Sequence, residues 1–469
     1  MVRSNVRNNT KKLRIAGYAL GALGILATLP AAAQQKTGPG VPEDDSLTWQ
    51  GITLYGVVDI GLQYDTHSAP FTPYRPSASG SIVRSNDYES PFGLTPNNMG
   101  QSRVGIQGTE PLIEGLKAIF QVETFFNPQS GQIADALRSL TANNGKAVKN
   151  QNIGVDGSSA GQAFQTAFIG VQSDNYGSLT FGRQVTLLSE GMIKYDPNYM
   201  ATAFGLLGGS NTYAGGGTSE DNRLNDLAKY NWSFKDLVHI GGLYQFNESS
   251  GSGQTAVQAN LGGGYAGASL DAYYSKIYSA VTASALTAAQ VTTLPTGDAL
   301  NNSLAATISD NTTYSLMGSY QLDPVKFFAG YENIKYANPR TDIAAGTIGI
   351  GGYVLAYVNN TAYTQTKFVQ VFWTGVRYTL LPGLDLTGAY YQVHQSAYGT
   401  TAATAGCVSD LHSTCAGNIE AISFDADYRF NVHFDIYAGA MYSSAHGGLG
   451  SGYLYSTDIN PTIGARFKF

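Results

Sequence analysis

Alternation of apolar and polar residues over about ten positions is the feature that most restricts the fold of this chain. Apolar side chains occupy every second position of 419–430 and 433–442, with polar or charged ones between them. The same pattern recurs in 52–65, 238–247 and 313–322. Side chains on a strand point alternately to its two faces, whereas an amphipathic helix repeats about every 3.6 residues. The pattern therefore predicts long strands with one apolar and one polar face.

A membrane-spanning sheet explains this pattern better than a water-soluble one. A tilted strand crosses a bilayer in roughly 9–11 residues, and only alternate residues need to be apolar. Charged residues make up 13% of the chain, about half the usual share, while Tyr (31) and Phe (20) are abundant. No apolar run of about 18 residues follows residue 33, which argues against spanning helices. We therefore predict an all-β, closed antiparallel barrel that leaves no strand edge in lipid.

Connections between the expected strands are of two kinds. Asp, Asn, Pro and Gly predict short turns at 174–177, 235–236, 323–324, 381–383 and 431–432. Long polar segments lie near 66–98, 128–162, 185–224, 279–309, 338–364 and 396–418. Short periplasmic turns and long extracellular loops are typical of outer-membrane barrels, and the spacing predicts about 16 strands.

The N-terminal residues predict export. Residues 1–14 hold five basic and no acidic residues, and an apolar run then leads to Ala31-Ala32-Ala33. This is the pattern of a signal peptide over 1–33, although a retained anchor is the alternative. Residues 34–50 are expected to form a short extension and 51–469 the barrel. Removing 1–33 takes away five of 27 basic residues and none of 33 acidic ones, leaving a formal charge of −11, which argues against nucleic-acid binding.

Cys407 and Cys415 are the two cysteines of the chain. Export to an oxidising compartment and their close spacing favour a disulfide that closes a small loop. A metal site that includes His412 is the alternative, but no second group of ligands accompanies the pair. We expect no metal and no cofactor.

Five segments carry a more specific signal: TLYGVVD at 53–59, SRVGIQGTE at 102–110, GLKAIFQVE at 115–123, YGSLTFGRQ at 176–184 and GARFKF at 464–469. In this order they resemble the Gram-negative general porins, in particular the β-proteobacterial type. The resemblance implies a sixteen-stranded outer-membrane barrel, assembled as a homotrimer, whose third extracellular loop folds into the pore. It implies passive diffusion of small hydrophilic solutes and ions, and contact with lipid, lipopolysaccharide and the outer-membrane assembly machinery.

The resemblance also assigns residues to the pore. Arg103 matches a wall arginine, and by parity it lies opposite Val104 and Ile106. Arg223 is similar to the arginine after the inward loop, which should cover about 186–222. The acids expected on that loop are Glu190, Asp196, Glu220 and Asp221. Basic wall residues opposite such acids are a recognised means of selecting solutes in pores.

Two departures from the family pattern weaken the expected constriction on both sides. Gln165 stands where the family usually has a basic residue, and 203–206 lacks the acid of its relatives. With the charge of −11, these departures lead to the hypothesis of a weakly cation-preferring pore.

Phe467 and Phe469 end the chain on an alternating, apolar row. A terminal aromatic in this register is typical of a last barrel strand. We interpret the two side chains as a terminal assembly signal.

Other functions remain as alternatives from sequence alone: a substrate-specific channel, a surface receptor or adhesin, and a barrel esterase or phospholipase. No nucleophile-elbow pattern surrounds a serine, so we do not expect an enzyme.

Overall fold

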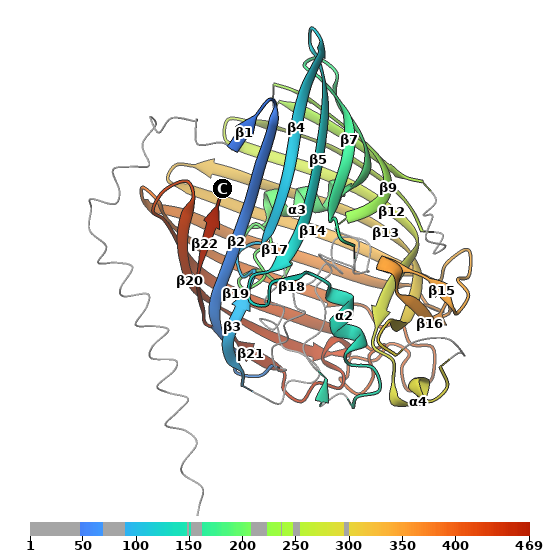
Figure 1. The fold of residues 1–469 in the computed structure, drawn as a ribbon. Coiled ribbons are helices and arrows are strands. Elements are labelled where there is room, and N and C mark those ends of the chain that lie inside the picture. Colours follow the sequence, from blue (N-terminus) through green and yellow to red (C-terminus); the bar gives the residue numbers. More distant parts are fainter. Residues whose placement is uncertain are drawn as a thin grey trace, which may run out of the picture.

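The strands form a closed antiparallel barrel in the computed structural model, as the alternation predicted (Figure 1). Pairing among the described residues joins sixteen of the strands into the ring. The structure describes residues 47–68, 90–147, 150–151, 162–207, 223–235, 237–246, 254–294 and 300–469. In order around the ring, the strands are β2 (Ile52–Tyr64), β4 (Arg103–Ile113), β5 (Leu116–Asn127), β7 (Thr166–Ser173), β8 (Gly177–Val185), β9 (Arg223–Phe234), β10 (Val238–Gln245), β11 (Thr255–Tyr265), β12 (Ala268–Ser284), β13 (Ser303–Leu322), β14 (Val325–Ala337), β17 (Lys367–Leu381), β18 (Leu384–Gln395), β19 (Gly417–Arg429), β20 (Phe434–Gly447) and β22 (Thr462–Lys468). The ring closes because β22 pairs with both β20 and β2.

Short elements extend the barrel or lie in its loops. The short strands are β1 (Leu47–Trp49), β3 (Phe92–Pro96), β6 (Gln132–Ile133), β15 (Thr347–Ile348), β16 (Val354–Asn359) and β21 (Thr457–Ile459). The helices are α2 (Ala136–Thr141), α3 (Leu187–Tyr195), α4 (Ala288–Val291) and the 3₁₀ turns η6 (Ile350–Gly352) and η7 (Gly448–Gly450). None of the helices in the described ranges is long and apolar enough to cross a membrane.

Strand pairing begins before the barrel start predicted at residue 51. Leu47 to Trp49 of β1 pair with β2, so the sheet includes the end of the segment 34–50. The predicted signal peptide and residues 34–46 lie outside the described residues.

Exposure along the strands is the reverse of that in a water-soluble sheet. On β19, Ile422 and Phe424 are 59% and 49% exposed, whereas Ser423 and Asp425 beside them are 3% and 1% exposed. The apolar side chains face outward and the polar ones face the interior of the ring. This arrangement suits a barrel with lipid outside and a polar lumen.

Short turns join the strands at one end of the barrel and long loops join them at the other. The predicted turns between β7 and β8, β13 and β14, β17 and β18, and β19 and β20 are present. The turn predicted at 235–236 includes Asp236, which lies outside the described residues. One loop boundary was wrong. The segment predicted as a loop at 279–309 is strand at both ends, because β12 and β13 continue to pair from Ala280–Ser309 to Ser284–Ala305. Leu304, Ile308 and Val281 in this extension pack with Leu137 of α2 and Leu355 of β16.

The third long segment packs against the inner wall. The side chain of Thr186 caps α3 by accepting a hydrogen bond from the backbone N–H of Ser189. Leu188 and Met192 of this helix are buried in a cluster with Leu243 of β10 and Trp373 of β17. Figure 1 shows α3 within the ring of strands. The lumen is therefore partly filled at the level of this helix.

Candidate pore constriction

A cavity of about 860 Å³ lies between α3, with the segment after it, and the wall formed by β22, β2, β4, β5, β7, β8 and β9. Apolar and uncharged polar side chains, including Tyr55, Gln121 and Thr202, form part of its lining. The charged residues of the lining are Arg103, Glu123, Glu190, Arg223, Lys229, Arg466 and Lys468. Strand alternation brings the wall residues to the lumen from distant parts of the chain.

Glu123 lies between two basic residues of the wall. Its carboxylate lies 3.3 Å from Nε of Arg103 and 3.8 Å from Nη2 of Arg223, and it accepts a 3.1 Å hydrogen bond from the hydroxyl of Tyr55. The guanidinium of Arg223 also lies 4.6 Å from the centre of the Phe125 ring. The side chain of Glu123 is 6% exposed and that of Arg103 is 36% exposed, so the positive charge of Arg103 faces the water.

Lys229 of β9 links the wall to α3. Its ammonium group donates to Oε1 of Glu190 at 2.6 Å and to the carbonyl of Val185 at 2.9 Å. Lys229 is nearly buried, whereas Glu190 is 44% exposed. The first turn of α3 therefore presents a partly neutralised acid to the lumen.

A second basic group comes from the last strand. Arg466 and Lys468 lie on the lumen side of β22 and both contact Asp435 of β20, at 3.0 Å and 2.7 Å. Arg466 also lies 3.5 Å from Asp427. Asp435 is buried behind the two cations, so the cations are the charges that line the cavity.

Hydrogen bonds fix the segment after α3 to the opposite wall. Nε1 of Trp373 donates to the carbonyl of Tyr195 at 3.0 Å, and Nη2 of Arg377 donates to the carbonyl of Pro197 at 2.8 Å. The amide of Asn198 donates to the hydroxyl of Tyr391 and to Oγ of Ser423, each at 3.1 Å. Because β17, β18 and β19 all contribute, the position of the segment is set by the barrel itself.

The last turn of α3 has its own anchor on β12. The buried carboxylate of Asp271 accepts a 3.0 Å hydrogen bond from Lys194 and another from the hydroxyl of Tyr195. The ring of His239 on β10 contacts the same carboxylate. Both ends of α3 are thus attached to the wall by charged groups.

The described residues contain no group of three or more His, Cys, Asp or Glu side chains placed to hold a metal ion. What the cavity offers is a space lined by charged side chains of both signs. A pore with a lining of this kind can sort solutes by size and charge.

Comparison with known proteins decides the family. A sequence model of the Gram-negative porins matches residues 19–448. This chain is a Gram-negative porin.

Two curated relatives are outer-membrane porins. The porin is 31% identical over 176 residues to an outer membrane porin of Bordetella pertussis. This match covers 38% of this chain and 35% of that protein. It is 27% identical over 249 residues to outer membrane porin protein 32 of Delftia acidovorans. This match covers 53% of this chain and 54% of that protein. The matches thus span about a third and about half of those relatives. Family and fold together place the porin in the outer membrane.

Solved structures share the fold at low sequence identity. An anion-selective porin from Comamonas acidovorans superposes with a TM-score of 0.56 at 16% identity, covering 89% of this porin and 99% of that chain. OmpT of Vibrio cholerae gives 0.54 at 14% identity, covering 91% and 100%.

The residues assigned to the pore from sequence fall into three groups. Arg103, Arg223 and Glu190 line the cavity. Gln165 and Asp196 are fully buried away from its lining. Glu220 and Asp221 lie outside the described residues.

The contacts of the two buried residues explain their positions. Gln165 accepts a 3.3 Å hydrogen bond from Arg183 and donates to the carbonyl of Gln162. Asp196 accepts 2.6 Å hydrogen bonds from the hydroxyl of Tyr391 and the backbone N–H of Met200. Burial raises the pKa of Asp196 to about 6, although these hydrogen bonds lower it. In this structure Asp196 holds the loop to the wall.

Sequence reasoning missed four lining residues that have lumen-facing parity. Glu123, Arg466 and Lys468 lie within the segments that resemble the family but were given no role in the pore, and no prediction was made for Lys229. Parity with Arg103 on neighbouring strands could have identified Glu123, since Arg103 pairs with Phe125 across β4 and β5.

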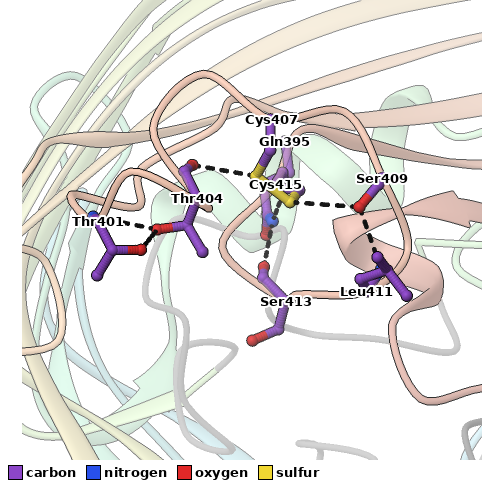
Figure 2. The surroundings of a disulfide bond; sticks show 8 residues. All are labelled: Gln395, Thr401, Thr404, Cys407, Ser409, Leu411, Ser413 and Cys415. Carbon is purple, nitrogen blue, oxygen red and sulfur yellow. Dashed lines mark hydrogen bonds between the residues drawn. A yellow bond between two sulfur atoms is a disulfide. The ribbon is translucent and has the colours of Figure 1, made fainter.

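Cys407 and Cys415 form a disulfide in the loop between β18 and β19 (Figure 2). Nε2 of Gln395 donates to the carbonyls of Ser413 and Cys415 at 2.8 Å and 2.9 Å, which attaches the closed loop to the end of β18. With both sulfurs bonded to each other, neither is a free thiolate for a metal.

Phe467 and Phe469 lie at the end of the closing strand and are partly exposed. The backbone of Phe469 makes two hydrogen bonds with Gly56 of β2, at 2.9 Å and 3.1 Å. The chain end is therefore part of the closure of the barrel.

Proposed function

We propose that this porin forms a water-filled channel through which small hydrophilic solutes and ions cross the outer membrane by passive diffusion. The observation that carries the proposal is the charged cavity between α3 and the wall. Both sides of it are fixed, the wall by strand pairing and the α3 segment by hydrogen bonds from Trp373 and Arg377. A passage with fixed walls passes solutes according to size, without a conformational step. No catalytic step is part of this proposal.

Solute flux into liposomes tests the channel directly. Purified porin in multilamellar liposomes should allow swelling with small sugars, and the rate should fall steeply as the sugar becomes larger. Equal swelling with and without porin, from protein that is folded and inserted, would contradict passive diffusion.

We infer a weak anion preference, which reverses the cation preference hypothesised from sequence. Among the described residues of the lining, five are basic and two are acidic. The sequence argument relied on Gln165 and 203–206, but Gln165, Ala203, Phe204 and Leu206 are buried away from the cavity. One similar solved structure is of a porin described as anion-selective, although that likeness extends only to fold.

Reversal potentials in a KCl gradient test the preference. We expect chloride to permeate better than potassium. A potential of the opposite sign would restore the cation-preferring hypothesis and would show that residues outside the described lining dominate the field.

We further propose that the porin is a homotrimer embedded in lipid and lipopolysaccharide, delivered by the outer-membrane assembly machinery through Phe467 and Phe469. OmpT, an outer membrane protein of Vibrio cholerae with a similar fold, was solved in a trimer form, which supports the oligomeric state. Light scattering of the detergent-solubilised porin should give three copies per particle; a monomeric mass would contradict the trimer.

Replacing both Phe467 and Phe469 by serine should reduce assembly of the porin in cells.

A further inference from the structure

The cavity between α3 and the barrel wall has two unlike sides. The wall side carries the basic residues described above, whereas the side formed by α3 and the segment after it carries Ile193, Tyr199 and Met200. Among the described residues of the lining, Glu190 is the acid on this second side, and its carboxylate lies 2.6 Å from Nζ of Lys229. The cavity therefore places positive charge opposite apolar and aromatic side chains.

The position of Ile193 follows from the two faces of α3. One face buries Leu188 and Met192 against the wall. Glu190 and Ile193 are three residues apart, which places them side by side on the other face of the helix. Ile193 is 41% exposed there and lines the cavity. An apolar surface left in water is unfavourable, so a solute with an apolar body gains free energy when it covers Ile193.

Tyr199 and Met200 have a strained backbone. Their φ angles are 51° and 58°, in the left-handed region that residues other than glycine rarely adopt. The backbone N–H of Tyr199 donates to the carbonyl of Asp196 at 3.0 Å, and that of Met200 donates to its carboxylate at 2.6 Å. Strain of this kind persists where the surroundings fix it, and it is concentrated at functional sites such as ligand clamps. Here both strained residues line the cavity.

Two side chains of the wall hold the ring of Tyr199 in place. The guanidinium of Arg377 on β17 lies 4.0 Å from the centre of the ring, and the ring of Phe328 on β14 meets it edge-on with the centres 6.2 Å apart. Tyr199 is nevertheless 41% exposed. Its ring is therefore a fixed aromatic surface, on which a planar ring of a solute can stack with little loss of side-chain freedom.

Arg103 supplies the charge that such a solute needs at its other end. Its side chain is 36% exposed in the same cavity, although Glu123 lies 3.3 Å away. Guanidinium groups bind carboxylates through charge-assisted hydrogen bonds. The cavity volume of about 860 Å³ is within the range of pockets that hold small organic molecules, roughly 300–1,000 Å³. A carboxylate joined to an aromatic ring can therefore contact both sides of the cavity at once.

We propose that the cavity retains aromatic monocarboxylates on their way through the channel, with the carboxylate toward Arg103 and the ring against Tyr199 and Ile193. The inference rests on the proposed function, because a solute reaches this cavity only through an open channel. It adds a class of solute that is held by both charge and apolar contact, beyond selection by size and charge.

Block of the KCl conductance in planar bilayers tests the proposal, with benzoate as the probe and shikimate as the comparison. Both acids have the same number of carbon atoms and one carboxylate, but shikimate carries hydroxyl groups on a ring that is not aromatic. Wild type should bind benzoate on the order of fivefold more tightly, since stacking and apolar contact favour it. Tyr199→Ser/Ile193→Ser should remove most of this preference, whereas Arg103→Gln should weaken binding of both acids.

Two further variants separate the site from general effects. Tyr199→Phe keeps the ring and should keep the preference for benzoate. Val408→Ser/Leu411→Ser removes apolar side chains that are 79% and 77% exposed in the loop between β18 and β19, outside the cavity, and should also keep it.

The outcomes distinguish this inference from the proposed function. Conductance that benzoate and shikimate block equally, or a preference that Tyr199→Ser/Ile193→Ser leaves unchanged, would overturn the inference and leave the channel intact. Absence of KCl conductance from every folded and inserted protein would overturn the proposed function and the inference together.

Discussion

At the scale of single residues, we expect Glu123 to set how strongly the wall attracts anions. It is nearly buried and lies within 4 Å of both Arg103 and Arg223. Replacing Glu123 by glutamine removes its negative charge but keeps its shape. The positive charges of Arg103 and Arg223 are then less compensated. Glu190, the other described acid of the lining, compensates one cation, Lys229, whereas Glu123 lies between two.

Glu123→Gln should therefore raise the chloride-to-potassium permeability ratio. One unit charge several ångströms from the permeating ion contributes roughly 0.5–1 kcal/mol in water, which corresponds to about a two- to fivefold change. The measurement is the reversal potential in a KCl gradient. Glu110→Gln, on the outward face of β4, is the matched control and should leave the ratio unchanged; an equal shift in both variants would contradict a local role for Glu123.

Asp196 should make docking of the α3 segment depend on pH. Its pKa is about 6 in the docked segment and near 3.8 for an ordinary aspartate. The docked state therefore holds its proton more tightly, and the docking free energy falls as pH rises through this interval. Between pH 5 and pH 7 the loss is roughly 1 kcal/mol.

Hydrogen exchange of the Met200 amide, which donates to Asp196, measures this docking. Its protection free energy, corrected for intrinsic exchange, should be smaller at pH 7 than at pH 5. Asp196→Asn should remove the dependence. Protection that increases with pH in the wild type would contradict the assignment.

At the scale of elements, period-two alternation was sufficient to place strands that have lipid on one side and water on the other. It failed for 279–309, where β12 continues to Ser284 and β13 begins at Ser303. There Leu304 and Ile308 are buried by α2 and β16, which are distant in sequence. No lipid-facing row exists in such an extension, so the alternation that reveals a spanning strand is absent.

Loss of the disulfide between β18 and β19 should affect only the loop that it closes. Closing a loop of this size restricts the unfolded chain by roughly 2–3 kcal/mol, but the loop is attached to the barrel through Gln395. Cys407→Ser/Cys415→Ser should increase proteolysis between the two positions and leave single-channel conductance unchanged. Peptide mapping after limited proteolysis and bilayer recordings check both parts; loss of conductance in folded protein would show that the loop supports the lumen.

At the scale of the whole molecule, the barrel and its family could be predicted from the sequence, whereas the charges of the constriction could not. Asp196 was assigned to the pore because it is an acid on the third loop, yet its contacts turn it to the wall. That orientation depends on Tyr391 and Met200, and a motif does not encode such contacts. Arg466 and Lys468 enter the lining only because closure of the ring brings the last strand beside the first.

Single-channel recording in a planar bilayer tests the central claim, that the lumen is an open water-filled passage. Purified, unboiled porin in KCl should produce stable conductance steps, with closures in threes from the trimer. Folded and inserted protein that gives no steps would contradict the account and would mean that the α3 segment closes the barrel.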